Sequence, residues 1–126
     1  MNDFLNEISG TDFEFKVTAD KIWVDLGHAY GTKLTAEFVF DTAKGMVHVC
    51  YLFVPAEPDD FISKKDYIAL KTDLEQKYGK LNVYQLSKAF DTAWWQTETE
   101  MVELFCYAHR NKITEIILDF TDLNQN

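Results

Sequence analysis

The 126-residue sequence predicts an α+β domain with a mainly antiparallel, twisted sheet of about seven to eight strands. Three observations predict this fold class. Segments in which apolar and polar residues alternate lie before and after one helical stretch, turn-forming residues separate many of these segments, and only that stretch has a long helical pattern. We therefore expect the order ββββ-α-ββββ, with strands joined as meander hairpins and one main helix packed on one face of the sheet.

Four strands are expected before the helix because their apolar residues recur at every second position. In the first of them, Phe13, Phe15 and Val17 alternate with polar residues, which is the pattern of a half-buried strand. A loop bracketed by glycines at 27–31 and a turn at 42–45 separate later strands. The expected strands are 12–18, 21–26, 33–41 and 46–54.

The helix is expected to begin after Ser63 and to end at Gly79. Ser63 and Asp66 have the spacing of a capping box, and Gly79 stands where a C-cap glycine belongs. The apolar stripe of this helix consists of Tyr67, Leu70, Leu74 and Tyr78. The strands expected after it are 82–87, 93–97, 101–108 and 113–120, the last two joined by a hairpin turn at 109–112. No internal sequence repeat is visible.

The chain is expected to form a single domain over residues 1–126, with residues 1–10 as a mobile tail in which residues 3–8 could form a short amphipathic turn. Hydrophobic residues make up 47% of the chain and aromatic residues 15%, which excludes intrinsic disorder. No apolar run has the length of a membrane span, and the first residues lack the features of a signal peptide, although a processed chain would look the same. We expect a cytoplasmic protein in which Cys50 and Cys106 are buried free thiols; one disulfide in an exported protein is the alternative.

The net charge of −9 comes from 21 acids and 12 bases, of which only Arg110 is an arginine. This balance argues against nucleic acid and anionic membranes as partners. The charge is uneven, with −7 over residues 1–60, +3 over 61–88 and −5 over 89–126. One reading is a solvated surface with internal complementarity between helix and sheet; the other is a surface that attracts a basic protein.

The sequence lacks the patterns typical of catalytic and cofactor sites. No serine or cysteine stands in a glycine elbow, and no glycine-rich phosphate-binding pattern occurs. A metal site could be assembled from His48 and Cys50 with Cys106 or His109, or from Glu57, Asp59 and Asp60. Neither set has the spacing of a structural zinc site or an EF-hand. We therefore expect no catalytic, metal-binding or cofactor-binding residues.

The C-terminal hairpin is the most informative segment, because its two faces differ in kind. One face is wholly apolar and is expected to pack on the core, whereas the other mixes carboxylates with large apolar side chains, as interface cores do. Alternation places Trp94 and Trp95 on opposite faces, so that one of them joins this surface. The alternative is that a loop or the N-terminal strands bury the aromatic residues within the monomer. The candidate partner-binding residues are Trp94, Trp95, Glu103, Phe105, Tyr107, Glu115, Ile117 and Asp119.

These observations favour a non-enzymatic interaction module that binds a basic protein through an acidic, aromatic sheet face. Inhibitor and immunity proteins offer an analogy of charge and size. A first alternative is a structural domain that self-associates as a two-fold dimer through the same face or an edge strand. A second alternative is a small-molecule binder or enzyme with a pocket between helix and sheet near Tyr67, Tyr78 and His48.

Overall fold

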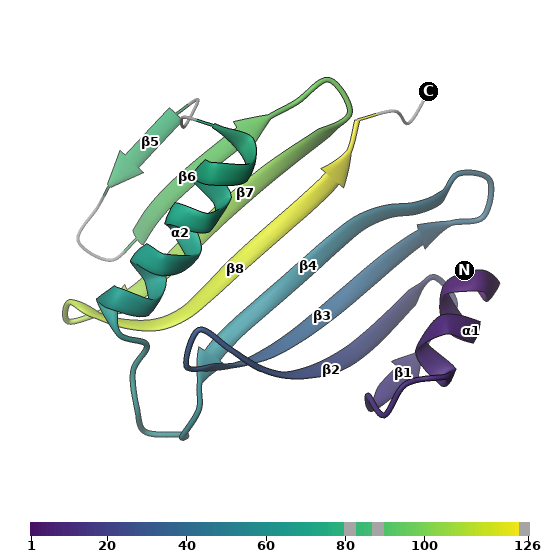
Figure 1. Ribbon diagram of the computed structural model, residues 1–126, viewed down its shortest axis with the longest axis horizontal. Helices are drawn as coiled ribbons and strands as arrows, with labels where there is room; N and C mark the ends of the chain where they lie inside the picture. Colours follow the sequence, from purple (N-terminus) through teal and green to yellow (C-terminus); the bar gives the residue numbers. More distant parts are fainter. Residues whose placement is uncertain (80–82, 87–89, 124–126) are drawn as a thin grey trace.

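The computed structural model describes residues 1–79, 83–86 and 90–123, with no side chains described for 83–86 and 90. Eight strands form one antiparallel sheet in the order β1-β2-β3-β4-β8-β7-β6-β5 (Figure 1). The elements in chain order are α1 (Asn2–Ser9), β1 (Phe15–Val17), β2 (Lys21–Ala29), β3 (Thr32–Asp41), β4 (Gly45–Pro55), α2 (Lys64–Tyr78), β5 (Val83–Leu86), β6 (Phe90–Gln96), β7 (Glu100–His109) and β8 (Lys112–Asp122). The α+β class and the antiparallel sheet are confirmed. None of the helices in the described part of the chain is long and apolar enough to cross a membrane.

The order of elements departs from the prediction at the N-terminus, where residues 1–10 were expected to be a tail. Asn2–Ser9 instead forms α1, whose Ile8 is buried. The Phe4 ring lies 4.4 Å from the Phe38 ring and 5.6 Å from the Phe40 ring, measured between centroids. Phe4 and Ile8 are four residues apart and so share one helix face. This short helix has no side-chain N-cap, so packing on the sheet rather than a local signal explains its presence.

The predicted loop at 27–31 is also wrong, because β2 continues through it to Ala29. A bulge between Asp25 and Gly27 shifts the register, and Gly27 takes a φ of 84° that a larger residue rarely adopts. The turn itself needs only Tyr30 and Gly31, which have φ values of 52° and 69°. The ends of the strand predicted at 82–87 lie outside the described residues.

The helix α2 follows its sequence signals closely. The Ser63 side chain accepts a hydrogen bond from the Asp66 N–H (3.0 Å), and the Gly79 N–H donates to the Glu75 carbonyl (2.8 Å). At Gly79 the φ of 89° suits a residue without a side chain. Three residues of the predicted stripe are buried against the sheet: Tyr67, Leu70 and Leu74.

The chain folds as two similar halves, each consisting of a helix followed by four strands. The first residues of β1, β2, β3 and β4 precede those of β5, β6, β7 and β8 by 68, 69, 68 and 67 positions (83−15, 90−21, 100−32 and 112−45). The last strands of the halves, β4 and β8, pair antiparallel at the middle of the sheet. This arrangement has an approximate two-fold axis perpendicular to the sheet. No visible sequence repeat indicates this symmetry.

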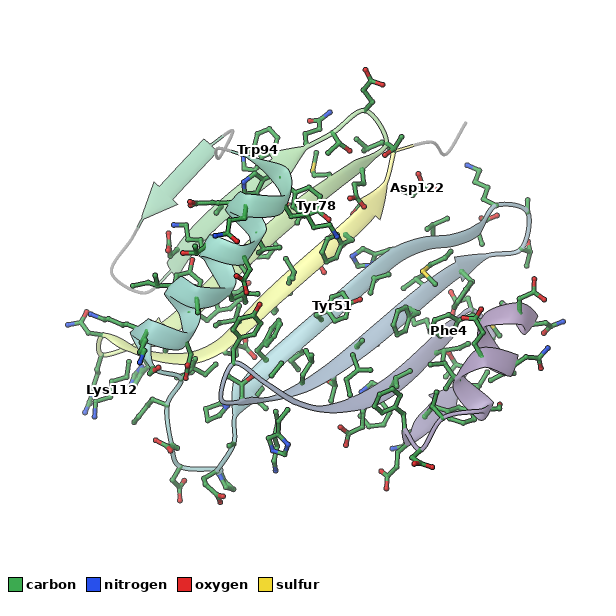
Figure 2. The ribbon with its side chains drawn as sticks, in the orientation of Figure 1. Phe4, Tyr51, Tyr78, Trp94, Lys112 and Asp122 are labelled. Carbon is green, nitrogen blue, oxygen red and sulfur yellow. The ribbon has the colours of Figure 1, made fainter. Side chains whose placement is uncertain are left out.

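Both helices lie on one face of the sheet, and a chain of ring contacts links them. Phe38 on β3 and Phe120 on β8 each contact Tyr51 edge-on, with centroid distances of 6.3 and 5.7 Å. Phe4 reaches this chain from α1, and Tyr78 reaches it from α2 through Phe120 (6.3 Å). Figure 2 shows Phe4 and Tyr78 on either side of Tyr51. No helix of the described chain covers the other face, which we call the open face.

Candidate protein-binding face

The open face carries a row of acidic side chains across the middle strands. Glu37, Asp119 and Glu103 occupy one register of the sheet, so their side chains project on the same side. Cys50 stands between Glu37 and Asp119, and a tryptophan closes each end of the row. From β2 to β6 the row reads Trp23, Glu37, Cys50, Asp119, Glu103, Trp94, and we call these six residues the carboxylate row.

An apolar strip lies beside the carboxylate row, two residues further along each strand. Leu52, Ile117 and Phe105 are neighbours in one register on β4, β8 and β7. All three are half-buried, so part of each apolar side chain remains in contact with solvent. An apolar strip edged by carboxylates is an arrangement suited to a protein partner.

The two tryptophans of the predicted site separate as alternation requires. Trp95 is 1% exposed, and its indole N–H donates a hydrogen bond to the Gly79 carbonyl (2.9 Å) under the end of α2. Trp95 is therefore out of reach of a partner in this fold, and Trp94 is the tryptophan that joins the open face. Trp94 is half-buried and lies opposite Glu103 on the open face.

The structure brings the other predicted residues together. Glu103, Phe105 and Tyr107 on β7 lie opposite Asp119, Ile117 and Glu115 on β8. The N-terminal strands do not fold over them, because β4 pairs with β8 and extends the sheet sideways. That sideways extension also adds residues which the sequence analysis did not assign to the site: Trp23, Glu37, Cys50 and Leu52. The period-two alternation of 21–26 places Trp23 on the face opposite Ile22 and Val24, but only the pairing of β4 with β8 places it in the same row as Asp119 and Glu103.

The charges of the carboxylate row are only partly offset. Lys21 approaches Glu37 at 3.4 Å, and His48 Nε2 lies 3.2 Å from Asp119 Oδ1. Glu103 has no ion pair within the part of the chain that is described. The face therefore keeps a negative charge for a cationic group to neutralise.

The thiol of Cys50 is held in its protonated form by its place in this row. The pKa of Cys50 is raised to about 12, most of all by burial and further by the hydrogen bond to Asp119 and the charges of Asp119 and Glu37. A thiol with this pKa is a poor nucleophile at neutral pH. The grouping of Cys50, His48 and Asp119 thus lacks the activated thiolate that a cysteine-dependent enzyme needs.

The metal sets considered from the sequence are not assembled. Cys106 is buried on the helix-bearing face, whereas His48 and Cys50 lie on the open face, so these three cannot share an ion. Over residues 1–79 and 90–123, no three His, Cys, Asp or Glu side chains are grouped closely enough to hold a metal ion.

The small-molecule pocket that the second alternative places near Tyr67, Tyr78 and His48 does not form from those three residues. The buried Tyr67 hydroxyl donates to Asp91 Oδ2 (2.7 Å), Tyr78 packs against Phe120, and His48 lies on the open face. A shallow cavity of about 290 Å³ lies elsewhere, where the ends of β4 and β8 diverge beside the β6–β7 turn. Its lining residues are Met46, Val47, His48, Val49, Thr99, Glu100, Phe120, Thr121 and Asp122.

Comparison with known proteins adds no relative. No protein-family model, no curated protein and no solved structure matches the chain. The geometry of the open face is therefore the basis for a functional argument.

Proposed function

We propose that the protein is a non-enzymatic interaction module whose open face binds a basic protein. The observation that carries this proposal is the carboxylate row, in which three acidic side chains of one register lie between Trp23 and Trp94 and beside an apolar strip. This combination offers a partner both charge and apolar contact area.

Each part of the face has a role in this binding. Glu37, Asp119 and Glu103 would accept hydrogen bonds from lysine or arginine side chains, and arginine can also stack on tryptophan. Leu52, Ile117 and Phe105 would cover the aliphatic part of those side chains and the apolar residues next to them. The net charge of −9 would attract a basic partner over a distance of about a Debye length, ~8 Å at physiological salt.

The test compares baits that differ by one charge. Lysate of the producing organism is passed over the immobilised protein, over Glu103→Lys and over Glu7→Lys, and the retained proteins are quantified by mass spectrometry. Glu7 is exposed on α1, on the helix-bearing side of the sheet, so Glu7→Lys matches the charge change without altering the open face.

We expect a basic protein to be retained by the wild type and by Glu7→Lys, released at high salt, and at least about tenfold depleted on Glu103→Lys. Equal retention of every captured protein on all three baits would contradict the proposal.

A further inference from the structure

The strand β1, at the edge of the sheet, exposes apolar side chains to solvent. Phe13, Phe15 and Val17 are 42%, 37% and 43% exposed, and every residue from 11 to 20 is exposed. They are three of the five large apolar residues that are exposed in the described part of the chain. Edge strands of monomeric proteins usually avoid such side chains, so this strand has the composition of a contact surface.

The backbone of β1 also has hydrogen-bonding capacity left over. The Asp25 N–H donates to the Glu14 carbonyl, and the Thr18 N–H donates to the Lys21 carbonyl, both at 2.9 Å. In an antiparallel pair the polar groups of successive residues point to opposite sides of the strand. The N–H and C=O groups of Phe15 and Val17 therefore point away from β2, toward whatever strand lies beyond the edge.

The sequence of this edge is complementary to itself. If a second copy of the edge runs antiparallel with Phe15 opposite its own counterpart, residue i faces residue 30−i of the other copy. Glu14 then faces Lys16, and Phe13 faces Val17. Each contact occurs twice because the arrangement is symmetric.

We propose that the protein forms a two-fold homodimer in which β1 pairs antiparallel with β1 of a second copy. The Phe15 pair would be hydrogen-bonded, because its N–H and C=O groups face the neighbouring copy. The Glu14–Lys16 pairs would fall on the more closely spaced positions between the strands, where side chains interact best.

The two sides of β1 contribute differently to this dimer. Phe15 and Val17 lie opposite Val24 and Ile22, so they face the helix-bearing side of the sheet and would form an apolar contact across the dimer axis. Lys16 lies on the open-face side, with its ammonium nitrogen 5.3 Å from the centroid of the Trp23 ring. The pairing would therefore join two sheets into one, with both open faces on the same side.

The dimer proposal does not depend on the proposed function, because β1 meets the carboxylate row only at the contact of Lys16 with Trp23, and Glu14→Lys leaves that contact in place. A β1 variant can lose the dimer while still binding a basic protein, and Glu103→Lys can lose the partner while keeping the dimer. The two proposals can therefore fail separately.

Sedimentation velocity of the whole chain tests the dimer over a range of protein concentrations. We expect the mass to rise from 14.7 kDa toward twice that value with increasing concentration. Glu14→Lys and Lys16→Glu each replace two attractive pairs with two repulsive ones, so each should weaken dimerisation at least about tenfold. Lys44→Glu, in the β3–β4 turn, has the same charge change as Lys16→Glu and should dimerise like the wild type.

Mixing the two single variants gives the decisive result. In a mixed dimer one copy carries lysine at both positions and the other carries glutamate at both, so every cross-strand pair is again attractive. An equimolar mixture should therefore dimerise about as well as the wild type, and the double variant Glu14→Lys/Lys16→Glu should do the same. A mass of 14.7 kDa at every concentration of the wild type would overturn the proposal and leave the edge for strand addition by a different protein. Failure of the mixture to recover would overturn the proposed register.

Discussion

Tyr51 on β4 and Leu118 on β8 face each other across the central strand pair, and they are also equivalent positions of the two halves. They are 67 residues apart (118−51), which is the offset between the first residues of β4 and β8. A residue that is paired with its own equivalent lies on the two-fold axis relating the halves. The axis of the sheet therefore passes between Tyr51 and Leu118.

This position explains how one side chain can join the two hydrophobic clusters. Tyr51 packs against the cluster under α2 and also against the cluster under α1. The side chains of the two neighbouring pairs project from the opposite side of the sheet. The pair Cys50–Asp119, on one side of the axis, is the centre of the carboxylate row. The pair Leu52–Ile117, on the other side, belongs to the apolar strip. The candidate face is thus built where the two halves meet, and neither half contains it alone.

The buried hydrogen bond between Tyr67 and Asp91 gives a stability prediction. Asp91 Oδ1 is buried without a hydrogen-bond partner, so the Tyr67 hydroxyl is the partner described for this carboxylate. Tyr67→Phe should lower the free energy of unfolding by about 2 kcal/mol, because it leaves a buried carboxylate unsatisfied. Urea denaturation followed by circular dichroism measures this loss.

Tyr30→Phe is the matched control for Tyr67→Phe. The Tyr30 hydroxyl also donates to a carboxylate, Asp73 Oδ2 at 2.5 Å, but that bond is exposed to solvent. Its loss should cost less than about 1 kcal/mol, because water can replace it. Equal losses for the two variants would show that burial does not govern the Tyr67–Asp91 bond.

The packing of α1 gives a second stability prediction. Phe4→Ala removes the ring that contacts Phe38 and Phe40, and it should lower the free energy of unfolding by about 2 kcal/mol, less than for a fully buried ring. Asn6→Ala, at an exposed position of the same helix, should change it by less than about 0.5 kcal/mol. A Phe4→Ala protein as stable as Asn6→Ala would show that residues 2–9 add nothing to the core.

The contrast between α2 and α1 shows which parts of the fold the sequence could predict. The boundaries of α2 follow from local chemistry, since Ser63 caps its first turn and Gly79 ends it. α1 has no such cap, and its short amphipathic pattern does not by itself distinguish a helix from a mobile tail; the contact of Phe4 with Phe38, 34 positions away (38−4), holds it on the sheet. The pairing of β4 with β8 is likewise non-local, so strand order was beyond a sequence argument.

The sequence likewise predicts only part of the candidate site. Alternation within β7 and β8 predicts that Glu103 and Asp119 share a face, and it predicts that Trp94 and Trp95 separate. It does not say which tryptophan is buried, because that depends on where α2 packs. Glu37 and Cys50 join the row only through the pairing of β4 with β8.

The high pKa of Cys50 predicts slow alkylation. With a pKa of about 12, its thiolate fraction at pH 8 is on the order of a thousandfold below that of an ordinary exposed thiol, and its iodoacetamide reaction should slow in proportion. The rate should keep rising with pH up to the limit of folding, and Asp119→Asn should speed it, because it removes a negative charge that favours the thiol and replaces one carboxylate oxygen with an N–H donor. Peptide mass spectrometry distinguishes Cys50 from Cys106. A plateau in the rate near pH 9 would contradict this prediction.

The same pKa fixes the sign of a pH effect on stability. The folded protein keeps the Cys50 proton up to about pH 12, whereas the unfolded chain releases it near the ordinary value of 9.0. Stability from this group is therefore fully present below pH 9 and is lost as pH rises toward 12. Urea denaturation at pH 8 and pH 10 should show a smaller alkaline loss for Cys50→Ala than for the wild type; an equal loss would mean that other groups dominate.

Binding kinetics test which residues of the open face govern the association rate and which govern the dissociation rate. Once a basic partner has been captured, Tyr107→Ala should speed its dissociation without changing association, because a half-buried aromatic side chain acts after contact is made. Glu115→Lys should lower the association rate, with a smaller effect at 300 mM than at 50 mM salt, since long-range attraction is screened. Surface plasmon resonance measures both rates, with Glu7→Lys as the charge-matched control. If Glu115→Lys and Glu7→Lys slow association equally, the net charge of the protein rather than the open face attracts the partner. If Tyr107→Ala leaves the dissociation rate unchanged, Tyr107 takes no part in binding.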